Sequence, residues 1–139
     1  AAGCGERLHL MGRRSDMPVW QAALDVALLA SHTAGFPNTV GEAMACGVPC
    51  VVTDAGGSAQ LLGVTGRVVP VGDRVGFSAG INELLQMSAF ERQQIGVLGR
   101  QRIIENFSLE RMVDRFERLW EEVLDAVPRG NQVQTRQVA

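Results

Sequence analysis

Short apolar runs, each bounded by glycine, proline or small polar residues, recur along the first half of the chain. Runs of about four to eight residues between such turn signals are typical of buried strands. Pro70 carries no amide hydrogen, so the last of these strands is expected to lie at an edge of its sheet or to end there. We predict strands over residues 8–11, 25–30, 49–53 and 67–71.

Helical patterns separate these runs and fill the second half of the chain. Asp16 as an N-cap and Pro18 in the first turn predict a helix to about residue 24. Pro37 predicts the start of a second helix, which Gly47 closes. A short helix is expected from Ser58, and longer helices are predicted over residues 75–87, 89–106 and 109–127.

The alternation of strands and helices over short loops predicts an α/β fold. We expect a Rossmann-like parallel sheet of about four strands, flanked by helices. Ligands of such sheets bind beyond the carboxyl ends of the strands. The loops expected to carry function are therefore residues 12–16, 31–37, 54–58 and 70–74.

The last predicted helix carries an apolar stripe at spacings of three and four, which indicates a packing face. The residues from Pro128 onward are polar and aperiodic. We therefore divide the chain into one domain over residues 1–127 and a disordered polar tail over residues 128–139. The stripe consists of Met112, Val113, Phe116, Leu119, Trp120, Val123 and Leu124.

The composition and charge of the chain indicate which classes of binding partner are disfavoured. The chain has 139 residues, 46% of them hydrophobic, and a net charge of −2 without a basic stripe or block. This pattern disfavours nucleic acid as a partner and offers no basic patch to a membrane surface. No apolar run is long enough to cross a bilayer, and the N-terminus shows no signal peptide.

The cysteines indicate a reducing compartment. Cys4, Cys46 and Cys50 form neither an even set nor a CxxC pair. Cys46 and Cys50 are interpreted as small core residues. No His, Cys or carboxylate cluster has the spacing of metal ligands. We expect a cytoplasmic domain without a transmembrane segment and without a bound metal.

The segment over residues 31–42 carries the clearest chemical signal. Gly35 permits an unusual backbone angle after a strand, and Pro37 then starts a helix. The free amides around Asn38, Thr39 and Val40, together with the positive end of the helix dipole, form an anion site. We expect this site to bind a phosphate or pyrophosphate.

Glu42 is a carboxylate beside this predicted anion site. Helical side chains lean toward the N-terminus of their helix, so Glu42 lies above Asn38 and Thr39 and reaches the ligand end. This position suits an acceptor of hydrogen bonds from a sugar diol such as ribose. The alternative is that Glu42 compensates the helix dipole on a solvated surface.

Two further groups allow more than one interpretation. Gly56 and Gly57 form either a loop that approaches a ligand or a plain tight turn. Arg13 and Arg14 either neutralise a phosphate or form a solvated pair with Asp16. The residues alone therefore predict a phosphate- and diol-binding α/β domain.

The sequence contains runs from Leu10 to Arg13, from Gly35 to Pro37 and from Glu42 to Pro49, together with Asp16, Asp25, Asp54 and Gly66. In these residues the chain resembles the retaining glycosyltransferases of family 4, also called group 1. The resemblance covers nearly the whole chain to about Leu124. It implies the donor-binding, C-terminal half of a GT-B architecture, in which two Rossmann-like domains enclose the active site.

The resemblance also implies roles for individual residues. It places Gly12 and Arg13 beside the nucleotide base and Glu42 at the ribose. It assigns the amides near Gly35, Phe36, Pro37, Asn38, Thr39 and Val40 to the diphosphate and sugar. The implied donor is a UDP-, GDP- or ADP-sugar, and the implied transfer retains configuration without a metal or other cofactor.

The chain departs from the family pattern at two positions. Ala34 stands where the carboxylate pair E-x7-E has its first glutamate, and Gln60 stands where a carboxylate usually follows the glycine pair. The acceptor-binding N-terminal domain and the basic diphosphate clamp are not in this sequence, so the isolated chain is expected to be inactive. Two alternatives stay open: a GT-B nucleotide-sugar epimerase and a non-catalytic nucleotide-sugar-binding module. The full-length protein is expected to be cytoplasmic or peripheral to a membrane.

Overall fold

The computed structural model describes residues 5–126. The chain divides into two compact units, Ala1–Ile104 and Glu105–Ala139. The first unit contains the sheet and the helices packed on it, and the second contains the last helix. The tail predicted over residues 128–139 lies outside the described residues.

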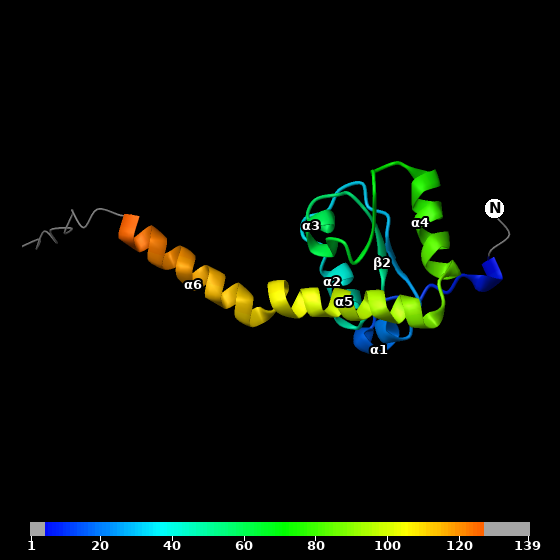
Figure 1. The fold of residues 1–139 in the computed structure, drawn as a ribbon, viewed down its shortest axis with the longest axis horizontal. Coiled ribbons are helices and arrows are strands. Elements are labelled where there is room, and N and C mark those ends of the chain that lie inside the picture. Colours follow the sequence, from blue (N-terminus) through cyan, green and yellow to red (C-terminus); the bar gives the residue numbers. More distant parts are fainter. Residues whose placement is uncertain (1–4, 127–139) are drawn as a thin grey trace, which may run out of the picture. The chain divides into compact units, whose positions relative to one another are not determined.

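The secondary-structure elements follow the order expected from the sequence after the first predicted strand (Figure 1). They are η1 (Gly5–Arg7), α1 (Met17–Ala22), β1 (Ala27–Leu29), α2 (Asn38–Ala45), β2 (Cys50–Thr53), α3 (Ser58–Leu62), β3 (Gly66–Val69), α4 (Arg74–Gln86), α5 (Ala89–Phe107) and α6 (Leu109–Ala126).

Three parallel strands form one sheet in the order β1–β2–β3. All four residues of the central strand β2 are buried, since strands flank both its edges and helices pack on both its faces. The strand β3 lies at an edge and ends at Val69, which confirms the expectation from Pro70. The parallel α/β fold is confirmed, but the described residues form three strands where about four were expected.

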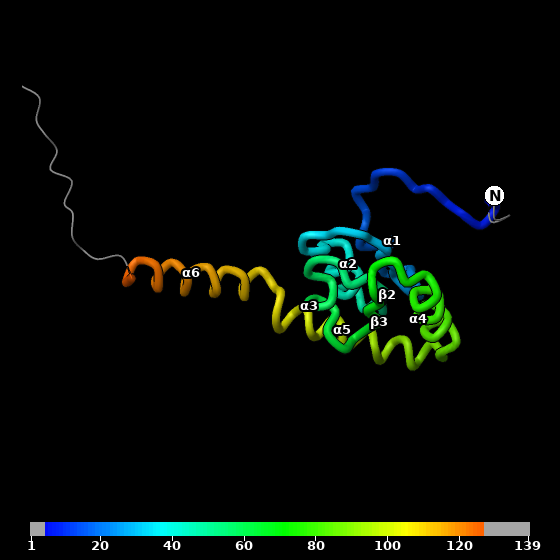
Figure 2. The backbone as a smooth tube through the Cα atoms, turned by 90° about the horizontal axis from the view of Figure 1, so that it is seen from above, coloured from blue at the N-terminus to red at the C-terminus, as the bar shows by residue number. Residues whose placement is uncertain are grey.

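Helices pack on the sheet from different sides, with α4 on one side of β2 and β3 and with α2 and α3 on the other (Figure 2). Val51, Val69 and Leu84 form a buried cluster where α4 meets the sheet. A β-carbon added to Gly80 of α4 would lie 3.3 Å from the Cγ1 atom of Val51. The missing side chain at Gly80 therefore lets α4 approach the central strand closely.

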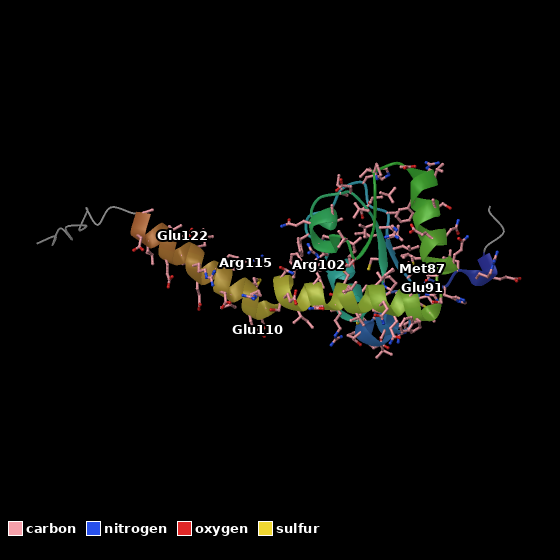
Figure 3. The ribbon with its side chains drawn as sticks, viewed as in Figure 1. Met87, Glu91, Arg102, Glu110, Arg115 and Glu122 are labelled. Atoms are coloured by element: carbon pink, nitrogen blue, oxygen red, sulfur yellow. The ribbon has the colours of Figure 1, made fainter. Side chains whose placement is uncertain are left out.

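The helix α5 begins with a capping box and fixes the end of α3, and Figure 3 labels Glu91 and Arg102, which make these contacts. The Ser88 amide donates to the Glu91 carboxylate at 2.8 Å, and the Glu91 amide donates back to the Ser88 hydroxyl at 3.3 Å. Arg102 donates to the backbone carbonyls of Leu61 at 2.9 Å and of Gln60 at 2.7 Å. These carbonyls belong to the last turn of a helix, which cannot satisfy them itself.

Residues 8–11 do not form a strand, which corrects the first prediction from the sequence. Leu8, Leu10 and Met11 are exposed instead. An extended segment makes no hydrogen bonds of its own, so an apolar run becomes a strand only beside a neighbouring strand. In the described sheet, β1 pairs only with β2, and this edge position also leaves Leu28 exposed where burial on both faces was expected.

The apolar stripe of α6 is not packed within its own unit. No residue of α6 is buried, and the side chains of Phe116 and Trp120 are among the exposed ones. A single helix cannot bury its own stripe, so the packing face predicted from the sequence is present without a partner in residues 105–126. Neither α6 nor any other helix within residues 5–126 has the length and apolarity of a membrane span.

The two described cysteines differ in their surroundings. Cys50 lies on the central strand and is buried, which raises the pKa of its thiol to about 12. Cys46 is half-buried at the end of α2, and both cysteines are free thiols. The interpretation as a core residue is confirmed for Cys50, whereas the side chain of Cys46 is only partly buried. Cys4 falls outside the described residues.

Candidate ligand-binding site

The loop that follows β1 is tied to the end of the neighbouring strand. The hydroxyl of Thr53, the last residue of β2, donates to the Ser31 carbonyl oxygen at 2.6 Å and lies 3.3 Å from that of Leu29. Thr53 is buried. The loop over residues 30–37 therefore leaves the carboxyl end of the sheet in a defined direction, at the location where parallel sheets bind ligands.

Gly56 and Gly57, which follow β2, pack against the backbone of this loop. Gly56 has a positive φ of 57°, and a β-carbon added there would lie 1.8 Å from the Ala34 carbonyl oxygen. The Gly57 amide donates to the Gly35 carbonyl oxygen at 2.9 Å. The close backbone approach that paired glycines permit is thus made to the loop before α2, which the sequence did not indicate.

The helix α2 begins at the end of this loop, behind Pro37 as its N-cap residue. The Asn38 amide donates to the Phe36 carbonyl oxygen at 3.0 Å, and the Val40 amide donates to that of Pro37 at 3.0 Å. Two of the three amides expected to be free are therefore engaged within the loop. The Thr39 amide donates to no acceptor among residues 5–126 and points out of the first turn, where the helix dipole favours an anion.

Glu42 lies one turn further along α2 and is exposed. Its Oε2 atom accepts a hydrogen bond from the Gln21 amide nitrogen at 3.1 Å. Its Oε1 atom has no hydrogen-bond donor among the described residues. A carboxylate has several acceptor sites, so Glu42 can accept further hydrogen bonds from a ligand while Gln21 stays bound.

The sequence analysis did not single out Gln21, which lies on α1 and is 5% exposed. Its amide nitrogen also lies 3.5 Å from the Thr39 carbonyl oxygen. No motif marks this glutamine, because its two partners are about twenty residues away in the sequence. Gln21 is the one buried residue of α1, so no apolar face of that helix marks the position in the sequence.

Gly12 and Arg13 lie in the segment that precedes α1, which runs outside the packed helices (Figure 2). Both are exposed, and no hydrogen bond or ion pair among the described residues joins them to α2. Arg14 donates to Asp16 at 2.7 Å and lies over the Trp20 ring, 4.8 Å from its centre. This ion pair holds the pKa of Asp16 below its ordinary value. Arg14 and Asp16 thus form the solvated pair considered from the sequence.

A cavity of about 360 Å³ opens at the carboxyl ends of the strands on the side of α4. His32 follows β1, and Arg74 and Phe77 belong to the first turn of α4, which places parts of two predicted loops in its wall. None of its lining residues comes from α2. Among the described residues, no three His, Cys, Asp or Glu side chains gather closely enough to hold a metal ion.

Comparison with known proteins identifies a family and several relatives. The model of the family described as glycosyl transferases group 1 matches residues 1–87. N-acetyl-alpha-D-glucosaminyl L-malate synthase from Bacillus anthracis is 32% identical over 121 residues, which cover 86% of this chain and 32% of that protein. UDP-Gal:alpha-D-GlcNAc-diphosphoundecaprenol alpha-1,3-galactosyltransferase from Escherichia coli is 28% identical over 120 residues, 83% of this chain and 30% of that protein.

A solved structure has a similar fold over most of the chain. Sucrose-phosphate synthase from Thermosynechococcus elongatus matches with a TM-score of 0.69 and 26% sequence identity. The match covers 78% of this chain and 28% of that protein. The chain thus spans about a third of the length of these relatives.

Proposed function

The chain belongs to the group 1 glycosyltransferases, and from that membership we propose that it binds the nucleotide-sugar donor of a sugar-transfer reaction. In the full-length protein the sugar passes from this donor to an acceptor. The relatives described above are named as synthases or glycosyltransferases, which favours transfer over epimerisation. We assign this chain the donor side of a GT-B active site.

The observation that carries the proposal is the pairing of Glu42 with the first turn of α2. Glu42 lies exposed beside the unbonded Thr39 amide and has an acceptor oxygen available. The amide and the helix dipole attract a diphosphate, and the carboxylate accepts hydrogen bonds from hydroxyl groups. A nucleoside diphosphate carries both groups a short distance apart, whereas a simple anion would be repelled by the carboxylate.

Other parts of the donor are assigned to neighbouring residues. We assign the base to Gly12 and Arg13, and the diphosphate and sugar to the segment from Gly35 to Val40, in which the Thr39 amide has no acceptor among the described residues. We propose a UDP-, GDP- or ADP-sugar as the donor, with retention of configuration and without a metal. The donor named for the relative from Escherichia coli, UDP-Gal, belongs to this class.

Ala34 supports a second candidate function, that of a non-catalytic nucleotide-sugar-binding module. An alanine offers no acceptor to the hydroxyl groups of the donor sugar. Ala34 lies in the loop that Gly56 supports, next to the start of α2. If this loop meets the sugar, as we propose, the side chain at position 34 offers no acceptor to its hydroxyl groups.

We place the full-length protein in the cytoplasm. The free thiols of Cys46 and Cys50 support this location, because thiols persist in reducing compartments.

Replacing Glu42 by alanine tests the assignment to ribose. In the full-length protein, calorimetry with UDP, GDP and ADP should show at least one nucleotide that binds, and Glu42→Ala should lower its affinity about tenfold or more. Inorganic pyrophosphate has no hydroxyl groups for Glu42 and is repelled by its charge, so its affinity should stay equal or rise.

The matched control is Glu83→Ala, which removes one carboxylate from α4. Glu83 forms an ion pair with Arg67 that lowers the pKa of Glu83 and lies outside the site. This variant should leave nucleotide affinity unchanged. If Glu42→Ala strengthens nucleotide and pyrophosphate binding alike, Glu42 is only a solvated charge beside an anion site and the ribose assignment is wrong.

A further inference from the structure

The buried side chain of Gln21 on α1 contacts the first turns of α2, where we propose that the ligand binds. Gln21 is 5% exposed, while its partner Glu42 is exposed. The Gln21 amide nitrogen donates to the Glu42 Oε2 atom at 3.1 Å and lies 3.5 Å from the Thr39 carbonyl oxygen. An amide group has two N–H donors, so it can serve both acceptors, which lie one helical turn apart.

Contacts to both the nitrogen and the oxygen of the Gln21 side-chain amide determine its orientation. Glu42 and Thr39 present two acceptors to its nitrogen, and the Cys46 thiol, a weak donor shared with the Pro18 carbonyl oxygen at 3.8 Å, lies 3.9 Å from its oxygen. A flipped amide would place its oxygen against a carboxylate and a carbonyl. Burial therefore holds Gln21 in one position, with its donors directed at α2.

We propose that Gln21 is a positioning residue that holds the Glu42 carboxylate in the orientation required to bind a ribose diol. This role rests on the proposed function. An exposed glutamate samples several rotamers, and a ligand that selects one of them binds more weakly for that reason. The hydrogen bond from Gln21 restricts Glu42 before the ligand arrives.

The chemistry of an amide suits this role better than that of a basic residue. A lysine or arginine at this place would neutralise the carboxylate and compete for its oxygens. The Gln21 amide is neutral and occupies one of the several acceptor sites of the carboxylate. Glu42 therefore keeps its charge and its remaining acceptor capacity for the hydroxyl groups of the ligand.

A simpler role for Gln21 would be to join α1 to α2 without affecting the ligand. The two roles differ in whether the effect of Gln21 depends on Glu42. A structural joint affects all nucleotides equally and acts whether or not Glu42 is present. A positioning residue affects recognition of the ribose hydroxyl groups and acts only through Glu42.

A double-mutant cycle in the full-length protein separates these roles. We would measure by calorimetry the affinities for UDP, GDP and ADP and for their 2′-deoxy counterparts, in the parent and in Gln21→Met, Glu42→Ala and the double variant. The parent should prefer the ribonucleotide about tenfold, and Gln21→Met should reduce this preference to about threefold or less. Glu42→Ala should have no preference, and adding Gln21→Met should change nothing further.

The outcomes that contradict the proposal differ from those that contradict the proposed function. An unchanged ribose preference in Gln21→Met would overturn the positioning role, as would an equal loss of affinity for both sugars in both Glu42 backgrounds. A parent protein without any ribose preference would instead overturn the assignment of Glu42. If Gln21→Met does not fold, Gln21→Leu provides the same test, because leucine is uncharged and cannot donate to Glu42.

Discussion

Gly96→Ala is expected to destabilise the chain by about 3 kcal/mol or more. A β-carbon added to Gly96 of α5 would lie 1.8 Å from the Gly47 carbonyl oxygen and 2.7 Å from the carbonyl carbon. Both are backbone atoms of the turn that closes α2, so no side-chain rotation relieves the clash. Either α5 moves away from the sheet or the turn after α2 deforms, and buried contacts are lost in both cases.

The matched control is Gly99→Ala in the same helix. Gly99 is also buried, but an added β-carbon would meet the Thr65 hydroxyl at 3.6 Å and the Met44 side chain at 3.8 Å, which are ordinary contacts. Alanine favours the helix over glycine, so this variant should be stabilised by about 0.5–1 kcal/mol. Urea unfolding midpoints should thus move in opposite directions. A Gly96→Ala protein as stable as the parent would show that α5 does not pack on this turn.

Gly56→Ala is expected to abolish most nucleotide binding, with a loss of affinity of about tenfold or more. The added β-carbon would lie 1.8 Å from the Ala34 carbonyl oxygen and 2.6 Å from that of Gly35. The loop that carries these atoms leads directly into α2. Displacing it moves the Thr39 amide relative to Glu42, and the two groups then no longer match one ligand.

A control is needed because Gly56 also has a positive φ of 57°, which strains alanine by itself. Gly72 has a positive φ of 86°, and a β-carbon there would meet nothing within 4 Å. Gly72→Ala should therefore lose about 1 kcal/mol of stability and keep its nucleotide affinity. Isothermal calorimetry measures the nucleotide affinity of both variants, and urea unfolding measures their stability. Together they separate the steric clash at Gly56 from the backbone strain that both variants share. Equal affinity in Gly56→Ala and the parent would contradict the supporting role of the glycine pair.

Elements with their own start and stop signals could be predicted closely from the sequence. Pro37 and Gly47 bracket α2, which the structure places at Asn38–Ala45. The apolar run that became β2 is short and rich in valine, and it is the buried central strand. These elements agree because proline, glycine and β-branched residues act on the backbone locally.

Features that depend on distant partners could not be predicted in the same way. Residues 8–11 have the composition of a strand, but a strand also needs a partner, and these residues do not pair with the open edge of β1. The stripe of α6 shows that the helix has a packing face without showing what covers it. A pattern in one segment reports the preference of that segment and not the presence of its partner.

The candidate site likewise has features that the local sequence predicts and features that depend on distant residues. The position of Glu42 near the start of α2 follows from helix geometry and could be stated in advance. The support from Gly56 and the hydrogen bond from Gln21 join segments about twenty residues apart, so no local pattern contains them. The sequence analysis predicted too many amides without an acceptor, because carbonyl oxygens of the loop accept hydrogen bonds from the amides of Asn38 and Val40.

The central claim is that the first turn of α2 and Glu42 bind the diphosphate and ribose of a nucleotide. Titrating the isotope-labelled chain with UDP, GDP and ADP, while following backbone amide chemical shifts, tests this most directly. For at least one nucleotide, saturable shifts should centre on the Thr39 amide and its neighbours through Glu42, and they should weaken in Glu42→Ala. Shifts centred instead on His32, Arg74 and Phe77, or no saturable shift with any of the three nucleotides, would contradict the claim.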